Sequence, residues 1–97
     1  MHLEIDVLKT FIAVAETGSV KFAAERVSRS PAAVSMQMKK LEQLIGMPVF
    51  HRAEGAMRLS DTGDKLMPHA YRLVWQEVLG RGGELPGSRG ARSHLRR

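Results

Sequence analysis

The chain has 97 residues, of which 43% are apolar and none is cysteine. This length supports one small domain, and the absence of cysteine excludes disulfide scaffolds, thiolate zinc sites and cysteine nucleophiles. No run approaches the ~18–20 apolar residues that a membrane span needs, and the early acids are unlike a signal peptide, so we expect a cytoplasmic protein without a membrane partner.

The positive charge is spread unevenly along the chain. Fifteen lysines and arginines oppose ten acids, which gives a formal net charge of +5. Residues 1–79 hold 10 basic and 9 acidic groups, whereas residues 80–97 hold five arginines and one acid. A basic balance favours a polyanionic partner, but here it describes mainly the C-terminal segment. The overall charge is therefore weak evidence that the folded part binds nucleic acid.

The first segment, residues 5–17, is predicted to be a helix. Glu4 and Asp6 lie at its start, where negative charge suits the helix dipole, and Gly18 supplies a stop. Apolar side chains at helical spacing form one stripe along it: Ile5, Leu8, Phe11, Ile12 and Ala15.

Two further short helices follow, separated by a polar turn. Ser19 is a suitable N-cap for a helix over residues 20–27, and Ser30 followed by Pro31 opens a third helix that Gly46 ends. The second helix directs Ala23, Ala24 and Val27 inward, and the third directs Val34, Met38, Leu41 and Ile45 inward. Helix, short turn and helix together predict a helix-turn-helix, whose DNA-binding versions place the second of the pair in the major groove.

The second half of the folded part predicts a hairpin and a fourth helix. Two short extended runs, 49–52 and 56–59, flank a turn and form a small two-stranded hairpin. Ser60 caps a helix that reaches residue 79, with a kink expected at Pro68. Its apolar face holds Leu66, Met67, Ala70, Leu73, Val74 and Val78. From residue 80 the glycine- and arginine-rich composition predicts a disordered tail, either a nonspecific phosphate clamp or an inert end.

The outward face of the third helix is the strongest functional signal. With Val34 set inward, the opposite face lacks carboxylates, is small and neutral at its start and basic further along, as groove entry requires. Lysines on a helix also occur on ordinary solvated faces, and helix pairs occur in adaptors. A ring of further cations around this helix favours DNA: Lys21, Arg29, Arg52 and Arg58. The outward face itself carries Ala32, Met36, Lys39, Lys40 and Gln43, with Ala33 and Ser35 on its flanks.

The same residues carry a family resemblance. The runs LKTF (8–11), AVAETGS (13–19), AAER (23–26) and AVSMQMKKLE (33–42), with PVF (48–50) and Gly63, resemble the N-terminal domain of LysR-type transcriptional regulators. The resemblance covers residues 3–79 without gaps. It implies a mainly α, winged helix-turn-helix fold and a long linker helix that pairs with its twin in a homodimer. It also implies binding to a two-fold symmetric promoter site in double-stranded DNA.

The resemblance also assigns roles to single positions. It places Ala32, Ser35 and Met36 where the family reads bases or adjacent phosphates, and Arg52 on the wing that reaches the minor groove. Pro31 departs from the family, which often has glutamine there, so readout at this position is expected through apolar contact, as with a thymine methyl.

The resulting prediction is a LysR-type regulator module without enzymatic activity. Residues 1–59 form the DNA-binding domain, 60–79 the dimerisation helix and 80–97 the tail. Bases are read by Pro31, Ala32, Ser35 and Met36; phosphates are bound by Lys21, Arg29, Lys39, Lys40, Arg52 and Arg58; the dimer interface consists of Leu66, Met67, Ala70, Leu73, Val74 and Val78.

Two alternatives and several absences complete the prediction. The family continues with an effector-binding domain, so we expect a truncated, frameshifted or DNA-binding-only version, with no small-molecule effector site. Such a chain could instead heterodimerise with full-length regulators through residues 60–79 and block them, or bind nucleic acid generally through its tail. The four scattered histidines lack metal-site spacing, so no metal or cofactor is expected.

Overall fold

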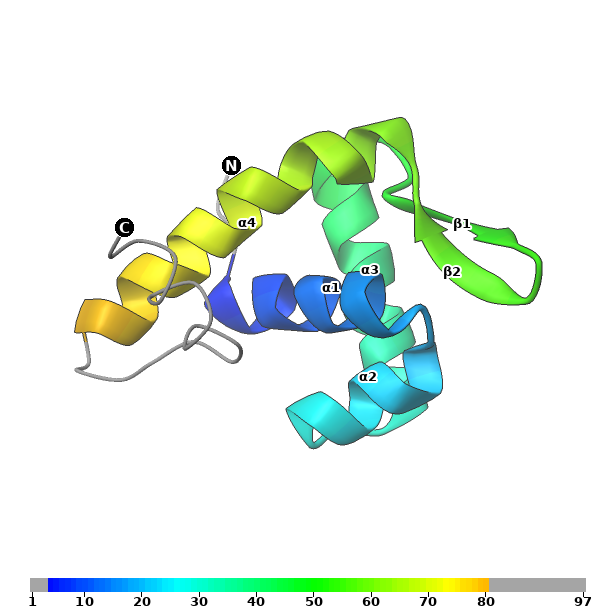
Figure 1. Ribbon diagram of the computed structural model, residues 1–97, viewed down its shortest axis with the longest axis horizontal. Helices are drawn as coiled ribbons and strands as arrows, with labels where there is room; N and C mark the ends of the chain where they lie inside the picture. Colours follow the sequence, from blue (N-terminus) through cyan, green and yellow to red (C-terminus); the bar gives the residue numbers. More distant parts are fainter. Residues whose placement is uncertain (1–3, 81–97) are drawn as a thin grey trace, which may run out of the picture.

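The computed structural model describes residues 4–80, which form four helices and one two-stranded antiparallel sheet (Figure 1). The predicted tail lies outside the described residues, except for Gly80. Each element appears where the sequence predicts it, although the first strand begins and ends one residue later and the last helix ends one residue later. In chain order the elements are α1 (Ile5–Thr17), α2 (Val20–Val27), α3 (Pro31–Ile45), β1 (Phe50–Ala53), β2 (Ala56–Leu59) and α4 (Asp61–Gly80).

Serine caps set the starts of three helices, as predicted. The side-chain oxygen of Ser19 accepts a hydrogen bond from the backbone N–H of Phe22 at 3.1 Å. Ser30 accepts one from Ala33 at 3.1 Å, and Ser60 accepts one from Gly63 at 3.0 Å. Each cap satisfies a backbone donor that the helix itself leaves without a partner, so these boundaries are encoded locally.

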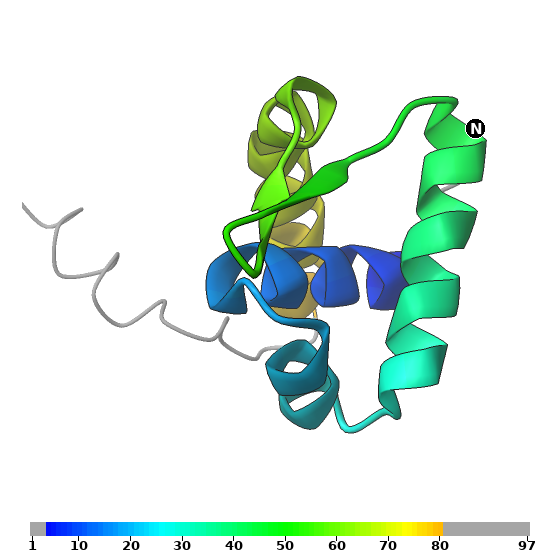
Figure 2. The ribbon, with the colours of Figure 1, turned by 90° about the vertical axis from the view of Figure 1, so that its right-hand side faces the viewer.

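The core is built around α1, which lies between α3 and α4, with α2 beneath it (Figure 2). A single apolar stripe predicts burial along one face, but α1 is covered on more sides than that. Leu8 and Phe11 of the stripe are fully buried, whereas Ile5, Ile12 and Ala15 are only partly buried. Further buried positions fill the gaps in the stripe: Val7, Thr10, Ala13 and Val14.

The hairpin docks onto the helical core through its turn-proximal and base residues. Glu54 and Gly55 have φ of 54° and 77°, the left-handed conformations of a two-residue turn that matches strand twist. The backbone N–H of Met57 donates to the carbonyl of Gly18 at 3.0 Å. At the base, the ring of Phe50 packs against Phe11 with centroids 5.3 Å apart. The wing is thus attached to α1 at two points, through Gly18 at its C-terminal end and through Phe11.

Helix α4 begins with a close approach to the rest of the chain. A Cβ atom at Gly63 would overlap the carbonyl oxygen of Val49 and lie 2.9 Å from a methyl of Leu59. Glycine is therefore required here for packing, although it weakens the helix intrinsically. The helix is continuous on both sides of Pro68, and the predicted kink stays a prediction. Among the described residues, no helix combines the length and apolarity needed to cross a membrane.

Candidate nucleic-acid interface

A tight turn between α2 and α3 presents the start of α3 at the surface. Ser28 adopts a left-handed conformation (φ 59°), and the N–H of Arg29 donates to the carbonyl of Ala24 at 2.9 Å. Pro31 then occupies the first turn of α3, where its missing N–H costs no intrahelical hydrogen bond. The backbone geometry of this turn therefore sets the direction of α3 relative to α2.

The outward face of α3 is open to solvent, as the sequence predicts. Inward, Val34, Met38 and Leu41 are buried. Outward, every residue of the predicted face is exposed, and Met36 retains 72% of its accessible surface. We call this set the α3 face: Pro31, Ala32, Ser35, Met36, Lys39, Lys40 and Gln43. No other described element covers it, so it is available to a partner.

Two polar side chains of α3 are turned away from that face by bonds inside the fold. Glu42, the single carboxylate of α3, accepts a hydrogen bond from the N–H of Val49 at 2.9 Å. The carboxamide oxygen of Gln37 accepts one from the hydroxyl of Thr10 at 2.7 Å. Sequence reasoning missed both bonds, because neither partner of α3 is adjacent in sequence. Together they remove the negative charge and one amide from the α3 face.

The six side chains predicted to contact phosphates differ in whether they already pair with an acid inside the fold. Lys39, Lys40 and Arg52 are exposed and form no ion pair within residues 4–80. Arg29 lies 3.4 Å from a carboxylate oxygen of Asp6, and Arg58 lies 3.8 Å from one of Glu54. Exposed pairs of this kind contribute about 0–1 kcal/mol, so a phosphate can compete for both arginines.

Lys21 completes this set at the start of α2. Its ammonium nitrogen lies 5.8 Å from the ring centroid of Phe22, an exposed aromatic side chain. A cation over an aromatic face is weakly attracted at an exposed site, by about 0.5–1 kcal/mol. Lys21 therefore keeps its charge available at the surface.

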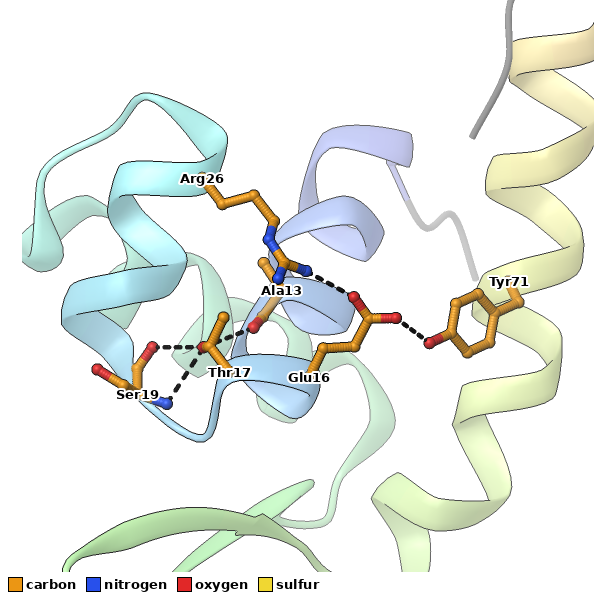
Figure 3. A network of polar contacts seen from close by, with 6 residues as sticks. All are labelled: Ala13, Glu16, Thr17, Ser19, Arg26 and Tyr71. Carbon is orange, nitrogen blue, oxygen red and sulfur yellow. Dashed lines mark hydrogen bonds and ion pairs between the residues drawn. The ribbon is translucent and has the colours of Figure 1, made fainter. Parts of the chain in front are cut away.

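A second polar cluster ties α1, α2 and α4 together, and the sequence does not predict it. Glu16 pairs with Arg26 at 2.5 Å and accepts a hydrogen bond from the Tyr71 hydroxyl (Figure 3). Burial, and then the bond to Glu16, raise the pKa of Tyr71 to about 12. Beside it, the Thr17 hydroxyl donates a hydrogen bond to the carbonyl of Ala13 at 2.7 Å and accepts one from the backbone N–H of Ser19 at 3.2 Å (Figure 3). This cluster connects the helix-turn-helix to α4.

The residues of the predicted dimer face fall into three groups by exposure, and the buried group corrects part of the prediction. Ala70 and Val74 are buried in the core of the single chain, because small side chains let α4 approach α1 closely. They are not available to a second copy. Leu73 is 38% exposed, and Leu79 is also exposed. Three others are partly buried and pack at the edge of the core: Leu66, Met67 and Val78.

A cleft of about 400 Å³ lies between α1, α2 and the second half of α4. Ile12, Val27 and Val78 contribute apolar lining, and both acidic and basic side chains also line it. It is separate from the α3 face in its lining residues. Within the part of the chain that the structure describes, no three metal-ligating side chains gather.

The folded part is therefore a winged helix-turn-helix protein, and the outward face of the second helix of the motif is exposed and free of carboxylates. Residues 5–64 match the family described as bacterial regulatory helix-turn-helix protein, lysR family, and the chain belongs to this family.

Curated relatives are transcriptional regulators by name. The chain is 40% identical over 74 residues to the HTH-type transcriptional regulator DgdR of Burkholderia cepacia, which covers 76% of this chain and 25% of DgdR. It is 42% identical over 67 residues to the HTH-type transcriptional regulator CfxR of Cupriavidus necator, a match that covers 69% of this chain and 21% of CfxR. The chain thus spans about a quarter of the length of these relatives.

Solved structures agree with the fold. The crystal structure of a CbnR_DBD–DNA complex has a TM-score of 0.72 at 32% identity, covering 95% of this chain and 99% of that chain. The BenM_DBD/benA site 1 DNA complex has a TM-score of 0.70 at 25% identity, covering 74% and 81%.

Proposed function

We propose that the chain binds double-stranded DNA sequence-specifically as the DNA-binding module of a transcription regulator. Helix α3 lies in the major groove, and the wing formed by β1 and β2 lies at the flanking minor groove. The observation that carries this proposal is the open α3 face, because Glu42, the single carboxylate of residues 31–45, is turned toward Val49. The CbnR and BenM domains, which share this fold, are named as DNA complexes.

Phosphate contacts supply most of the affinity in this proposal. Lys39, Lys40 and Arg52 have no competing ion pair in the described region, and Arg29 and Arg58 exchange a long surface pair for a phosphate. Each neutralised phosphate releases condensed counterions, so affinity falls steeply with salt. The small side chains at the start of α3 let the helix approach base edges without steric obstruction.

We further propose that two copies pair through α4. Leu73 and Leu79 expose apolar surface that a second helix would cover, and partly buried Leu66, Met67 and Val78 border it. Such pairing is isologous and presents two α3 faces, which matches a two-fold symmetric site. Ala70 and Val74 contribute indirectly, because they hold α4 on α1 and so orient each α3 face. A DNA-bound dimer of this kind would reside at the bacterial nucleoid, in the cytoplasm.

Selection of bound sites from random duplex DNA with the full 97-residue chain tests this function. The expected result is a two-fold symmetric motif, with sedimentation showing two chains per duplex. Leu73→Glu should shift the chain toward monomer and weaken binding, whereas Gln76→Glu adds the same charge at an exposed position of α4 and serves as control. The proposal would be contradicted if no motif is enriched, or if the chain binds all duplexes with equal affinity regardless of their sequence.

A further inference from the structure

The first turns of the α3 face have an unusual chemistry for reading bases. Pro31, Ala32, Ser35 and Met36 are exposed there, and none carries an amide or a guanidinium. Bidentate recognition of adenine needs an amide side chain, and that of guanine needs arginine or lysine. The positive groups, Lys39 onward, come only later along the helix.

The one amide close to these residues is occupied inside the protein. The carboxamide oxygen of Gln37 accepts a 2.7 Å hydrogen bond from Thr10, whose side chain is 1% exposed. Gln37 itself is partly buried between α3 and α1. Breaking this bond would leave a buried hydroxyl with one partner fewer, which disfavours turning the amide toward DNA. The start of α3 therefore presents mainly apolar surface.

Met36 is the largest element of that surface. Its thioether side chain is 72% exposed and has no apolar partner that buries it within residues 4–80. A flexible, polarizable side chain adapts to an apolar partner, and in the major groove the apolar group is the C5-methyl of thymine.

We propose that this chain selects thymine through methyl contacts made by Met36, with Pro31 and Ala32 beside it, in place of bidentate hydrogen bonds. The inference rests on the proposed function and specifies how its recognition helix discriminates. Specificity then arises from shape and apolar burial, so the preferred half-site contains thymine opposite the first two turns of α3. Ser35 adds a hydroxyl that bonds to a base edge or a phosphate without strong preference.

Replacement of thymine by deoxyuridine tests this directly, because it removes only the methyl group. With the wild-type chain and a selected duplex, each contacted thymine should lose about fourfold in affinity on replacement, the value expected for one buried methyl. Thymines outside the contacted positions should show no change and serve as internal controls.

A double-mutant cycle assigns the contact to Met36. Met36→Ala should weaken binding to the thymine duplex and abolish the thymine-to-uracil ratio at the position it contacts, and Met36→Leu should restore most of that ratio. Lys39→Ala should weaken binding to both duplexes equally and leave the ratio unchanged. Because both positions are exposed, circular dichroism should show the same fold for all variants.

The outcomes separate the two proposals. Equal affinity for thymine and uracil at every position of a selected motif would overturn methyl readout and leave DNA binding standing. A thymine-to-uracil ratio that survives in Met36→Ala would overturn the assignment to Met36. Failure to select any motif would overturn the proposed function, and this inference with it.

Discussion

Two clusters of polar and charged side chains on this fold each include an arginine, but they differ in whether their charges are paired. Around Glu16, an arginine and a tyrosine converge on one carboxylate and join three helices. On the α3 face and the wing, Lys39, Lys40 and Arg52 form no ion pair within the described chain. In the first cluster the charges are paired with one another and join helices of the fold. In the second cluster the positive charges stay unpaired within residues 4–80 and are available to a partner.

This contrast shows why net charge is a poor guide to function in this protein. Residues 4–80 hold ten cations and nine acids, yet these are not mixed evenly. Three of the acids, Asp6, Glu16 and Glu54, each pair with an arginine. Lys39, Lys40 and Arg52, on α3 and the wing, are among the cations that form no ion pair within residues 4–80.

The largest expected effect comes from the start of α4, where Gly63 packs against Val49 and Leu59 and belongs to neither cluster. Gly63→Ala introduces a methyl that overlaps the carbonyl oxygen of Val49, so the helix must shift. We expect a loss of about 1–3 kcal/mol in the free energy of unfolding, as for overpacking in a core. Urea denaturation measures it, and Lys65→Ala, exposed on the same helix, should change stability by less than about 0.5 kcal/mol. Equal stability of both variants would show that α4 is not held by this contact.

Removal of a free cation should affect DNA and not folding. Lys39→Ala should weaken binding to all duplexes and reduce the slope of log affinity against log salt by about one, because one phosphate contact is lost. Fluorescence anisotropy across a salt series measures the slope. The free energy of unfolding should not change, since the side chain is exposed. An unchanged slope would mean that Lys39 does not neutralise a phosphate.

Removal of a paired cation should do the reverse on a smaller scale. Arg26→Ala breaks the 2.5 Å pair with Glu16, and since both side chains are about 40% exposed we expect a loss of about 0–1 kcal/mol in stability. The salt slope of DNA binding should stay at the wild-type value. A reduced slope in Arg26→Ala would place this arginine among the phosphate contacts and abolish the distinction between the clusters.

The smallest effect is a pH dependence of stability at the alkaline end. The pKa of Tyr71 is raised from 10.0 to about 12 in the folded chain, so the unfolded chain loses this proton first. The associated stability is complete below pH 10 and is lost as pH rises toward 12. Tyr71→Phe should lower stability at neutral pH slightly and flatten this decline, as measured by urea midpoints from pH 8 to 11. A decline identical to that of the wild type would contradict the role of the Tyr71 hydroxyl.

The extent to which sequence predicts this fold depends on whether the signal is local. The serine caps at Ser19, Ser30 and Ser60, and the stop at Gly18, lie within a few residues of the boundaries they set, so each helix could be placed from sequence. Helical periodicity likewise identified the open side of α3. The boundary of β1 was displaced by one residue, because pairing with β2 and not composition determines which residue enters the ladder.

The candidate site was only partly predictable for the same reason. Exposure of Met36 and Lys39 follows from the position of Val34 in one helix. The bonds that withdraw Gln37 and Glu42 from the α3 face join residues 27 and 7 positions apart, and no pattern in the sequence pairs them. Periodicity also assigned Ala70 and Val74 to a dimer, because an apolar stripe does not specify which neighbour covers it.

By itself, then, the sequence determined the helices, their caps, the outward side of α3 and the family to which the chain belongs, since all of these are written in short-range patterns. Only the tertiary structure decided which cations are paired, which face of α4 packs against α1, and that residue 63 must be glycine. Those properties depend on distances between segments far apart in the chain, and such distances exist only after the helices have packed.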